Sequence, residues 1–239
     1  MKQVVLTIDD IPQKITPKMI DYLTENGIPA VMFAVGEKIE EGMDTLVYAL
    51  QKGIIIGNHS FTHPAFSSLS FEECVEEIEK TDLLLEKAYK LAGVPRIYKA
   101  FRFPYIDKGG DKKEKLHEYL KANGYMKIYD NDVTDENYIE THKNDLDVAC
   151  SFDIQEYNIP NGLMTIDDVM KHLKDYLYGN TADQTADQNG SDSFDIVLFH
   201  SHDDTERVVP DYYKLILGEM LKAKAKFVSA KWQKLAKKI

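Results

Sequence analysis

The chain has 239 residues, 44% of them hydrophobic, which is enough for one large domain with a sizeable core. Its formal net charge is -11, from 40 acidic and 29 basic residues. This charge argues against a nucleic-acid or anionic-membrane surface, because either partner would need a basic patch. The two cysteines, Cys74 and Cys150, are too few for a disulfide framework. They are expected to be buried thiols, although a single bridge stays open.

Short apolar runs alternate with amphipathic stretches along the chain. In chain order they predict strand 4–8, helix 17–26, strand 30–35, helix 44–51, strand 54–56, helix 70–91, strand 101–103, helix 112–122, strand 125–129, helix 166–178, strand 196–199, helix 212–224 and strand 227–228. Strands that alternate with helices pair in parallel, in a doubly wound sheet or in a barrel. The polar stretch 179–193 is expected to be a surface loop.

No export signal is visible at the start of the sequence. Its first apolar run begins at Val4 and meets Asp9 and Asp10 too early for the core of such a signal. No run reaches the roughly 18 apolar residues of a membrane span. The chain as written is therefore expected to be cytoplasmic, although a signal removed from the sequence would leave no trace.

Residues that can do chemistry follow nearly every predicted strand. Five such groups are Asp9 with Asp10, the segment 57–64, the segment 102–105, the acidic segment 130–135, and His200. In parallel α/β folds the carboxyl ends of the strands form one rim, and that rim carries the active site. We therefore expect these five segments, distant in sequence, to meet at one place.

A histidine pair in the second group indicates a metal. His59 and His63 are four residues apart, so on a helical turn their imidazoles would share one face. Unrelated surface histidines also occur at this spacing, but Asp10 can supply a third ligand. Two His and one Asp leave positions open for water and substrate, as catalytic sites do. Zinc is the default metal, and Co²⁺, Ni²⁺ or Fe²⁺ suit the same ligands.

The remaining polar groups suggest an acid and a base. In an extended segment Asp9 and Asp10 point to opposite sides, so one of them can bind the metal while the other faces the water as general base. The alternative is a solvated or capping acidic pair. Arg102 is expected to hold Asp9 ionised, unless it forms an ordinary surface ion pair. His200 is the predicted general acid, oriented by a carboxylate such as Asp132, although a core histidine fits that position equally well.

Two further segments give weaker alternatives. Residues 200–204, His-Ser-His-Asp-Asp, form a compact rival metal motif but lack a well-placed ligand from elsewhere, so a loop extension is favoured. Residues 130–134 match the DxDxT nucleophile motif of haloacid-dehalogenase-like phosphatases. That family predicts a strongly apolar strand before Asp130 at the start of the domain, which this chain lacks. An EF-hand fails because Asp135 and Thr141 stand where Gly and Glu are needed.

Taken together, these segments resemble the polysaccharide deacetylases of carbohydrate esterase family 4 over most of the chain. The family motifs TFDDGP, GNHTxTHP, RxPYG, DxxDW and LxH stand, in family order, at residues 7–12, 57–64, 102–106, 132–136 and 198–200. Ile11 and Ile106 each replace a Gly of these motifs, and Glu136 replaces the Trp. These replacements are expected to change the shape of the substrate groove.

The resemblance implies an α/β fold of the irregular (β/α)7-barrel type, with residues 1–239 as one catalytic domain. It implies metal-dependent removal of an N-acetyl group from an amino sugar or polysaccharide. A small non-polymeric amide, an O-acetyl ester, or a non-catalytic carbohydrate-binding relative are the alternatives, and the sequence indicates no oligomeric state. The implied site residues are Asp9 as base, Asp10, His59 and His63 as metal ligands, Arg102 orienting the base, the Tyr105 N–H at the oxyanion, His200 as acid with Asp132 behind it, and Pro104, Tyr105 and Leu198 as substrate-binding residues.

Overall fold

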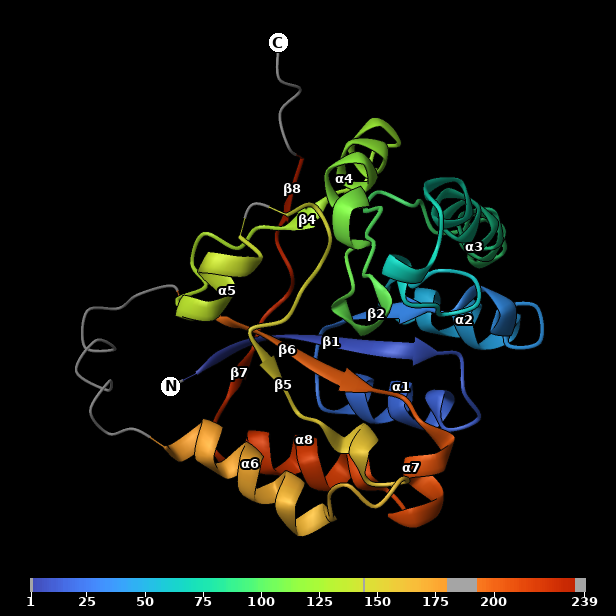
Figure 1. Ribbon diagram of the computed structural model, residues 1–239. Helices are drawn as coiled ribbons and strands as arrows, with labels where there is room; N and C mark the ends of the chain where they lie inside the picture. Colours follow the sequence, from blue (N-terminus) through green and yellow to red (C-terminus); the bar gives the residue numbers. More distant parts are fainter. Residues whose placement is uncertain (1, 144, 180–192, 235–239) are drawn as a thin grey trace.

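A parallel β-sheet forms the centre of the molecule (Figure 1). The computed structural model describes residues 2–143, 145–179 and 193–234. Within these ranges the strand order is β3-β2-β1-β6-β5, and β7 also pairs with β1. The strands are β1 (Gln3–Ile11), β2 (Ala30–Ala34), β3 (Ile55–Asn58), β5 (Phe152–Asp153), β6 (Asp195–His200) and β7 (Lys226–Phe227).

The central strands are apolar on both faces, as parallel strands covered on both sides must be. In β1, Val4 and Leu6 pack into one hydrophobic cluster, whereas Val5 between them packs into another. The parallel register sets Leu6 beside Ala30 of β2 and Val197 of β6. β1 and β6 therefore end at the same edge of the sheet, with Asp9 beside His200.

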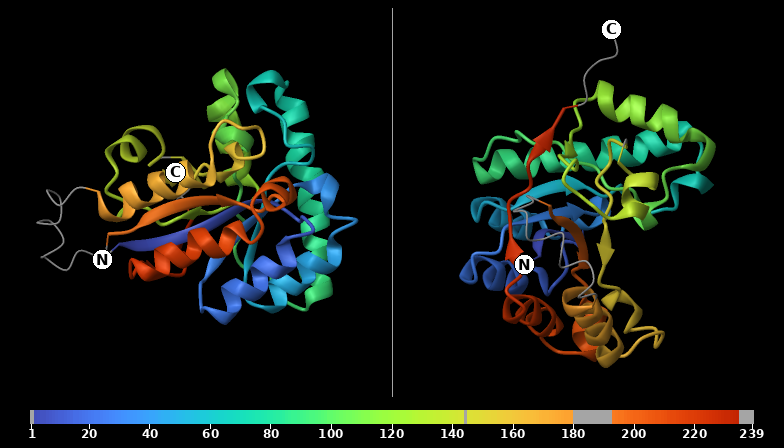
Figure 2. Two further views of the ribbon diagram at one scale, coloured as in Figure 1. Left: turned by 90° about the horizontal axis from the view of Figure 1, so that it is seen from below. Right: turned by 90° about the vertical axis from the view of Figure 1, so that its left-hand side faces the viewer.

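Helices pack on one face of the sheet, while the other face packs mainly against the segments that contain Ala100, Ile128 and Val148. In Figure 1, α1, α6 and α8 lie below β1 and β6, while α4 lies above, and the right-hand view of Figure 2 agrees. The capping box of Ser70 and Glu73 begins the longest helix, which ends at Gly93 in a left-handed conformation. The helices are α1 (Thr16–Glu25), α2 (Met43–Gln51), α3 (Phe71–Ala92), α4 (Lys113–Ala122), α5 (Glu136–Thr141), α6 (Ile166–Tyr178), α7 (Asp203–Val208) and α8 (Tyr212–Lys222).

Irregular main-chain pairing continues the sheet beyond β3. The Asn58 N–H donates to the Ala100 carbonyl, and the Val148 N–H donates to the Phe101 carbonyl. The chain that contains Val148 then runs into β5, which pairs with β6 at the other side of the sheet. The predicted α/β fold with a parallel sheet is confirmed, and these contacts favour the irregular barrel over an open doubly wound sheet.

Two predicted strands form only in part. Residues 101–103 contribute only one bridge, at Phe101, because the 3-10 turn η3 (Pro104–Ile106) follows at once. The predicted strand 125–129 shrinks to β4 (Lys127–Ile128), which pairs antiparallel with β8 (Trp232–Gln233) outside the parallel sheet. The acidic segment after β4 therefore does not reach the rim where β1 and β6 end.

Three smaller expectations can be compared with the structure. Cys74 and Cys150 are free thiols, Cys74 buried and Cys150 partly buried, so they form no bridge. Most of the predicted polar loop, residues 180–192, lies outside the described residues. No helix in the described ranges is long and apolar enough to cross a membrane.

Candidate active site

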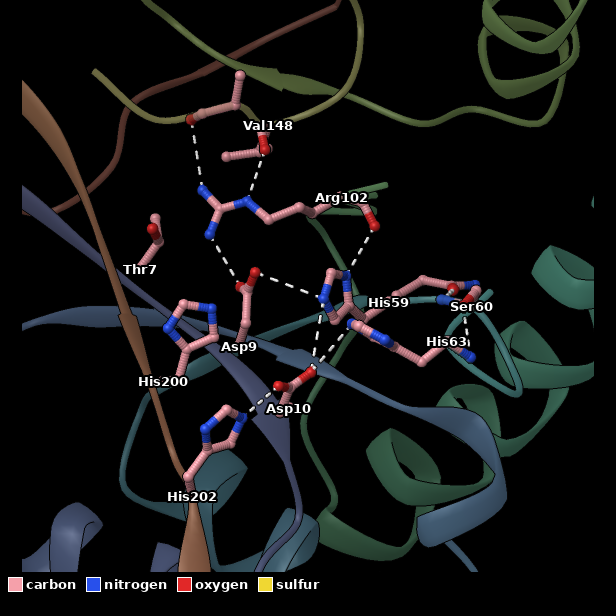
Figure 3. Close-up of polar contacts among 12 residues, drawn as sticks. Thr7, Asp9, Asp10, His59, Ser60, His63, Arg102, Val148, His200 and His202 are labelled. Carbon is pink, nitrogen blue, oxygen red and sulfur yellow. Dashed lines mark hydrogen bonds and ion pairs between the residues drawn. The ribbon is translucent and has the colours of Figure 1, made fainter. Parts of the chain in front are cut away.

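Asp9 and Asp10 lie at the carboxyl end of β1 (Figure 3). The pairing of β1 with β2 shifts register between Ile8 and Ile11, and Asp10 has a positive φ of 68°. The two carboxylates therefore do not point to opposite sides, as a regular strand predicts. Both approach the Nε2 atom of His59, Asp9 Oδ2 at 3.4 Å and Asp10 Oδ1 at 3.7 Å.

The two histidines that follow β3 come together through a turn and not through a helix. Ser60 and His63 have φ of 66° and 57°. The Asn58 side chain accepts a hydrogen bond from the Ser60 N–H at 2.9 Å, and the Ser60 hydroxyl accepts one from the His63 N–H at 3.1 Å. The turn places the His59 and His63 rings 4.8 Å apart, so the pair converges although the predicted helical geometry is wrong.

Asp10, His59 and His63 form a cluster that can hold a metal ion. One ligand atom from each residue lies within 4.8 Å of the others, and Asp10 Oδ1 is 3.3 Å from His63 Nε2. His59 Nδ1 is 2.8 Å from the Arg102 carbonyl, which directs its Nε2 atom into the cluster. Two imidazole nitrogens and one carboxylate oxygen suit zinc and similar transition metals.

Arg102 holds Asp9 in a buried ion pair. Its Nη1 atom is 2.8 Å from Asp9 Oδ1. Its Nε–H donates to the Val148 carbonyl at 2.7 Å, and Nη2 donates to the Ala149 carbonyl at 3.3 Å. The guanidinium also lies 4.6 Å from the ring centre of Phe33. With its donors fixed in this way, Arg102 orients one carboxylate oxygen and leaves the other facing the histidine cluster.

Glu156, and not Asp132, is the carboxylate beside His200. Glu156 Oε1 lies 3.0 Å from His200 Nδ1 and also accepts the His200 N–H at 2.5 Å. Asp132 lies at the other end of β6 from His200. Its carbonyl accepts a hydrogen bond from the N–H of Phe194, the residue just before β6 begins. His200 is at the carboxyl end of that six-residue strand, about 20 Å away at 3.3 Å per residue. The expected Asp132–His200 contact is therefore wrong.

A sequence signal for Glu156 exists. Asp153 and Glu156 have the spacing of the DxxDW motif, with Glu in place of the second Asp and Tyr157 in place of Trp. Asp153 ends β5 beside Leu198, so the segment enters the rim. The Tyr157 ring packs against His200 with centres 4.7 Å apart, and its hydroxyl donates to Asp153 at 3.0 Å. Residues 153–157 thus stand where the sequence analysis expected residues 132–136.

The site shifts several pKa values in useful directions. Burial alone would raise the pKa of Asp10, but the hydrogen bond from His202 and the nearby imidazoles hold it well below its usual range. Burial, with the neighbouring His59, lowers the pKa of His63 to about 4, so His63 is neutral at pH 7. Burial would also lower the pKa of His200, but Glu156 outweighs it and the pKa rises to about 9.

The rival metal motif at residues 200–204 spans the end of β6, two connecting residues and the start of α7. Both oxygens of Asp203 accept main-chain N–H groups, from Lys14 at 3.1 Å and from Ile15 at 2.9 Å. His202 contacts Asp10 Oδ2 at 2.5 Å and faces the first cluster. In the described residues these side chains do not gather around a centre of their own.

Of the expected substrate-binding residues, Tyr105 contacts the cluster. Tyr105 has a φ of 57° and a side chain that is 71% exposed, and its ring lies 4.7 Å from that of His63. Across the ranges that the structure covers, the Tyr105 N–H has no hydrogen-bond acceptor. Pro104 and Leu198 are buried beneath the rim. Tyr105 therefore offers both a free N–H and an exposed ring at the site.

The phosphatase alternative is wrong for this chain. A nucleophilic Asp130 would need a carboxylate oxygen free to attack a phosphate, but the buried Asp130 side chain is held by its neighbours. Its Oδ2 atom contacts Lys127 Nζ at 2.7 Å and accepts from the Tyr138 hydroxyl at 3.1 Å. Asp130 is therefore part of a buried ion pair with Lys127.

A second group, His117 with Asp145 and Asp147, also has metal-ligand spacing. Lys108 and Lys113 pair with Asp145, and Lys108 also lies 3.6 Å from Asp147. The two lysines already balance the two carboxylates, so this group is a buried ion-pair network.

Comparison with known proteins shows the family of the chain. A family profile for polysaccharide deacetylase matches residues 1–128. The chain is 34% identical over 86 residues to a peptidoglycan-N-acetylglucosamine deacetylase of Bacillus cereus, which is 36% of this chain and 31% of that protein. The match thus spans about a third of the curated relative's length.

Solved structures show the same fold. The chitin deacetylase of the fungal pathogen Colletotrichum lindemuthianum has a TM-score of 0.64 and 21% identity, covering 95% of this chain and 84% of that one. A pseudoenzyme of the CE4 family from Bacillus anthracis has a TM-score of 0.61 and 16% identity, covering 94% of this chain and 62% of that one. Since the profile covers more than half of the sequence, the chain belongs to the polysaccharide deacetylase family.

Proposed function

We propose that the chain is a metal-dependent deacetylase that hydrolyses the N-acetyl amide of an amino sugar or polysaccharide, with residues 1–239 as its catalytic domain. One observation carries the proposal: a metal-ligand cluster, a buried carboxylate and an imidazole with raised pKa meet at one rim. The groups are Asp10, His59 and His63, the Asp9–Arg102 pair, and the His200–Glu156 pair.

Zinc is the default metal for Asp10, His59 and His63, and Co²⁺, Ni²⁺ or Fe²⁺ suit the same donors. When bound, the metal polarises the acyl carbonyl and lowers the pKa of water. The chain prepares the ligands beforehand. His59 is oriented by the Arg102 carbonyl, and His63 stays neutral at pH 7 because of its low pKa.

Asp9 is the proposed base. Arg102 holds its Oδ1 atom, so Oδ2 faces the histidine cluster and can accept a proton from the attacking water. A buried carboxylate paired in this way keeps one orientation. This differs from the solvated acidic pair that was the alternative for Asp9 and Asp10, because Asp9 is only 3% exposed.

His200 is the proposed acid. Glu156 Oε1 holds the Nδ1 atom of His200 in a hydrogen bond. The Nε2 atom of His200 is therefore left to donate a proton to the amide nitrogen as the C–N bond breaks. A pKa of about 9 keeps His200 protonated at neutral pH. Acetate and the free amine are then the products.

The substrate is proposed to be an N-acetylated sugar. The Tyr105 N–H is placed to donate to the oxyanion, and the exposed Tyr105 ring offers an apolar plane to a sugar ring. Pro104 and Leu198 are buried near the rim, and Leu198 is the proposed lining for the acetyl methyl group. The names of the relatives, which specify peptidoglycan N-acetylglucosamine and chitin, support this substrate class.

The test measures acetate release from N-acetylated chitooligosaccharides and from peptidoglycan by the metal-loaded chain. Asp9→Asn should lower the rate by about 10²–10⁴-fold without loss of bound metal. Asp132→Asn is the matched control, since its carboxylate lies far from His200, and it should leave the rate unchanged. Full activity in Asp9→Asn would contradict the base assignment.

A second candidate function is carbohydrate binding without catalysis. The fold of the Bacillus anthracis pseudoenzyme motivates it, together with Ile11 and Ile106 at positions where the family motifs have Gly. Tight binding of chitooligosaccharides with no acetate release at any metal loading would support this function. If the chain releases acyl groups only from small amides or O-acetyl esters, the function is still hydrolysis, but the substrate is not an N-acetylated sugar.

A further inference from the structure

His202 contacts the metal ligand Asp10 from the side opposite to the other two ligands. Its Nε2 atom is 2.5 Å from Asp10 Oδ2, while Asp10 Oδ1 is 3.3 Å from His63 Nε2 (Figure 3). The two oxygens of one carboxylate therefore have separate partners. We infer that His202 is a positioning residue that fixes Asp10 with one oxygen turned toward the metal cluster. This inference rests on the metal site of the proposed function.

Whether His202 is a positioning residue or a metal ligand depends on whether its Nε2 atom carries a proton. A carboxylate oxygen only accepts hydrogen bonds, so Nε2 of His202 carries the proton. A protonated ring nitrogen cannot bind a metal at the same time. His202 therefore supports Asp10 from behind, as outer groups commonly do for metal ligands.

The loop that carries His202 is fastened to the segment that follows Asp10. The Ser201 N–H donates to the Asp9 carbonyl at 3.1 Å, and the Ser201 and Thr16 hydroxyls are 2.8 Å apart. Asp203 accepts the N–H groups of Lys14 and Ile15. The contacts on both sides of His202 thus tie its main chain to the end of β1.

Tyr212 of α8 fixes the same loop from the other side. Its hydroxyl donates to the His200 carbonyl at 2.7 Å and accepts the His202 N–H at 3.0 Å. The His200 and His202 rings lie 5.3 Å apart, with their planes 35° from parallel. The main-chain contacts of this loop thus hold the imidazole of His202 against Asp10.

This arrangement matters because Asp10 sits in a strained turn. Its positive φ of 68° is a conformation that Asp adopts only with support from its surroundings. A free carboxylate could rotate or bind the metal with both oxygens. The hydrogen bond from His202 keeps Oδ2 occupied and leaves Oδ1 for the metal.

The experiment measures Zn²⁺ and Co²⁺ affinity of the purified full chain by competition with a chelator. His202→Ala should weaken binding by about 10–100-fold, the usual cost of removing an outer partner. His202→Gln, whose amide nitrogen can donate to Asp10 but is a poor ligand, should restore affinity to within a few-fold of the wild type. His142→Ala removes a half-buried histidine from outside the cluster and should have no effect.

The Co²⁺ absorption spectrum separates the remaining outcomes. A positioning role predicts the same nitrogen-ligand count in His202→Gln as in the wild type. Wild-type affinity in His202→Ala would overturn the inference, and so would the loss of one nitrogen ligand from the spectrum of His202→Gln. A wild-type chain that binds no metal contradicts the proposed function itself. Metal that binds as described without acetate release contradicts only the catalytic proposal.

Discussion

The pair of His200 and Glu156 gives the sharpest prediction. Glu156 is fully buried, and its Oε1 atom accepts from both the main chain and the ring of His200. The rise of the His200 pKa from 6.5 to about 9 corresponds to about 3 kcal/mol in favour of the imidazolium. Glu156→Gln keeps the shape of the side chain but removes the largest contribution that raises this pKa.

In Glu156→Gln the largest contribution that opposes burial is lost and only the charges of Asp9 and Asp10 still oppose it, so the His200 pKa should fall well below its wild-type value. A folded-state pKa above the unfolded value stabilises the protein fully below about pH 6.5, and this contribution is lost as pH rises through about 9. The variant should therefore be destabilised most at pH 6, and its difference from the wild type should shrink by pH 9.

The assay is an imidazole NMR titration of the metal-free chain, with His200 assigned through His200→Gln. Metal-loaded enzyme provides a second readout, since the basic limb of the kcat profile should move to lower pH in Glu156→Gln. Asp132→Asn is the matched control and should leave both readouts unchanged. A His200 pKa that is the same in Glu156→Gln and the wild type would refute the reasoning.

Three further predictions follow from the same contacts. Arg102→Met should destabilise the chain by about 3–5 kcal/mol in urea unfolding, because it leaves Asp9 buried and unpaired; a loss under 1 kcal/mol would contradict this. Ile106→Gly should raise stability by about 0.5–1 kcal/mol, because a β-branched residue is strained at a φ of 55°; a lower Tm would argue against that strain. Zinc at 1,000 times its Kd should stabilise the wild type by about 4 kcal/mol, and Asp10→Ala should abolish this gain in thermal unfolding; an equal gain in the variant would place the metal elsewhere.

The parallel sheet and the long helices could be predicted because their signals are local. The apolar runs of β1, β2 and β6 and the capping box at Ser70 are visible in the sequence. The strand predicted over 125–129 forms only at residues 127–128 and does not join the parallel sheet, because pairing partners depend on the tertiary structure. β4 meets β8 from the end of the chain, and no local pattern indicates this.

Residue types at the site could be predicted better than their geometry. The sequence pointed to Asp10, His59 and His63, but it expected a helix and a regular strand. The positive φ angles at Asp10, Ser60 and His63 replace both, and polar residues in such conformations carry no periodic signal. Glu156 was missed because it stands where the motif has Asp, and the apparent match at Asp132 competed with it.

The role of His202 could not be read from its neighbours in the sequence. The run from His200 to Asp204 suggested a metal site of its own. In the structure, the loop instead faces Asp10, which is 192 positions away. Such a contact depends on β1 and β6 lying side by side, so it becomes visible only once the sheet order is known.

The central claim is that the metal cluster at the end of β1 and β3 serves amide hydrolysis. The most direct measurement titrates the metal-free chain with Zn²⁺ and follows acetate release from an N-acetylated chitooligosaccharide together with bound metal. We predict that the rate rises with metal, levels off at one ion per chain, and is absent from Asp10→Ala. Equal acetate release without metal, or one bound ion per chain with no acetate released, would contradict the account.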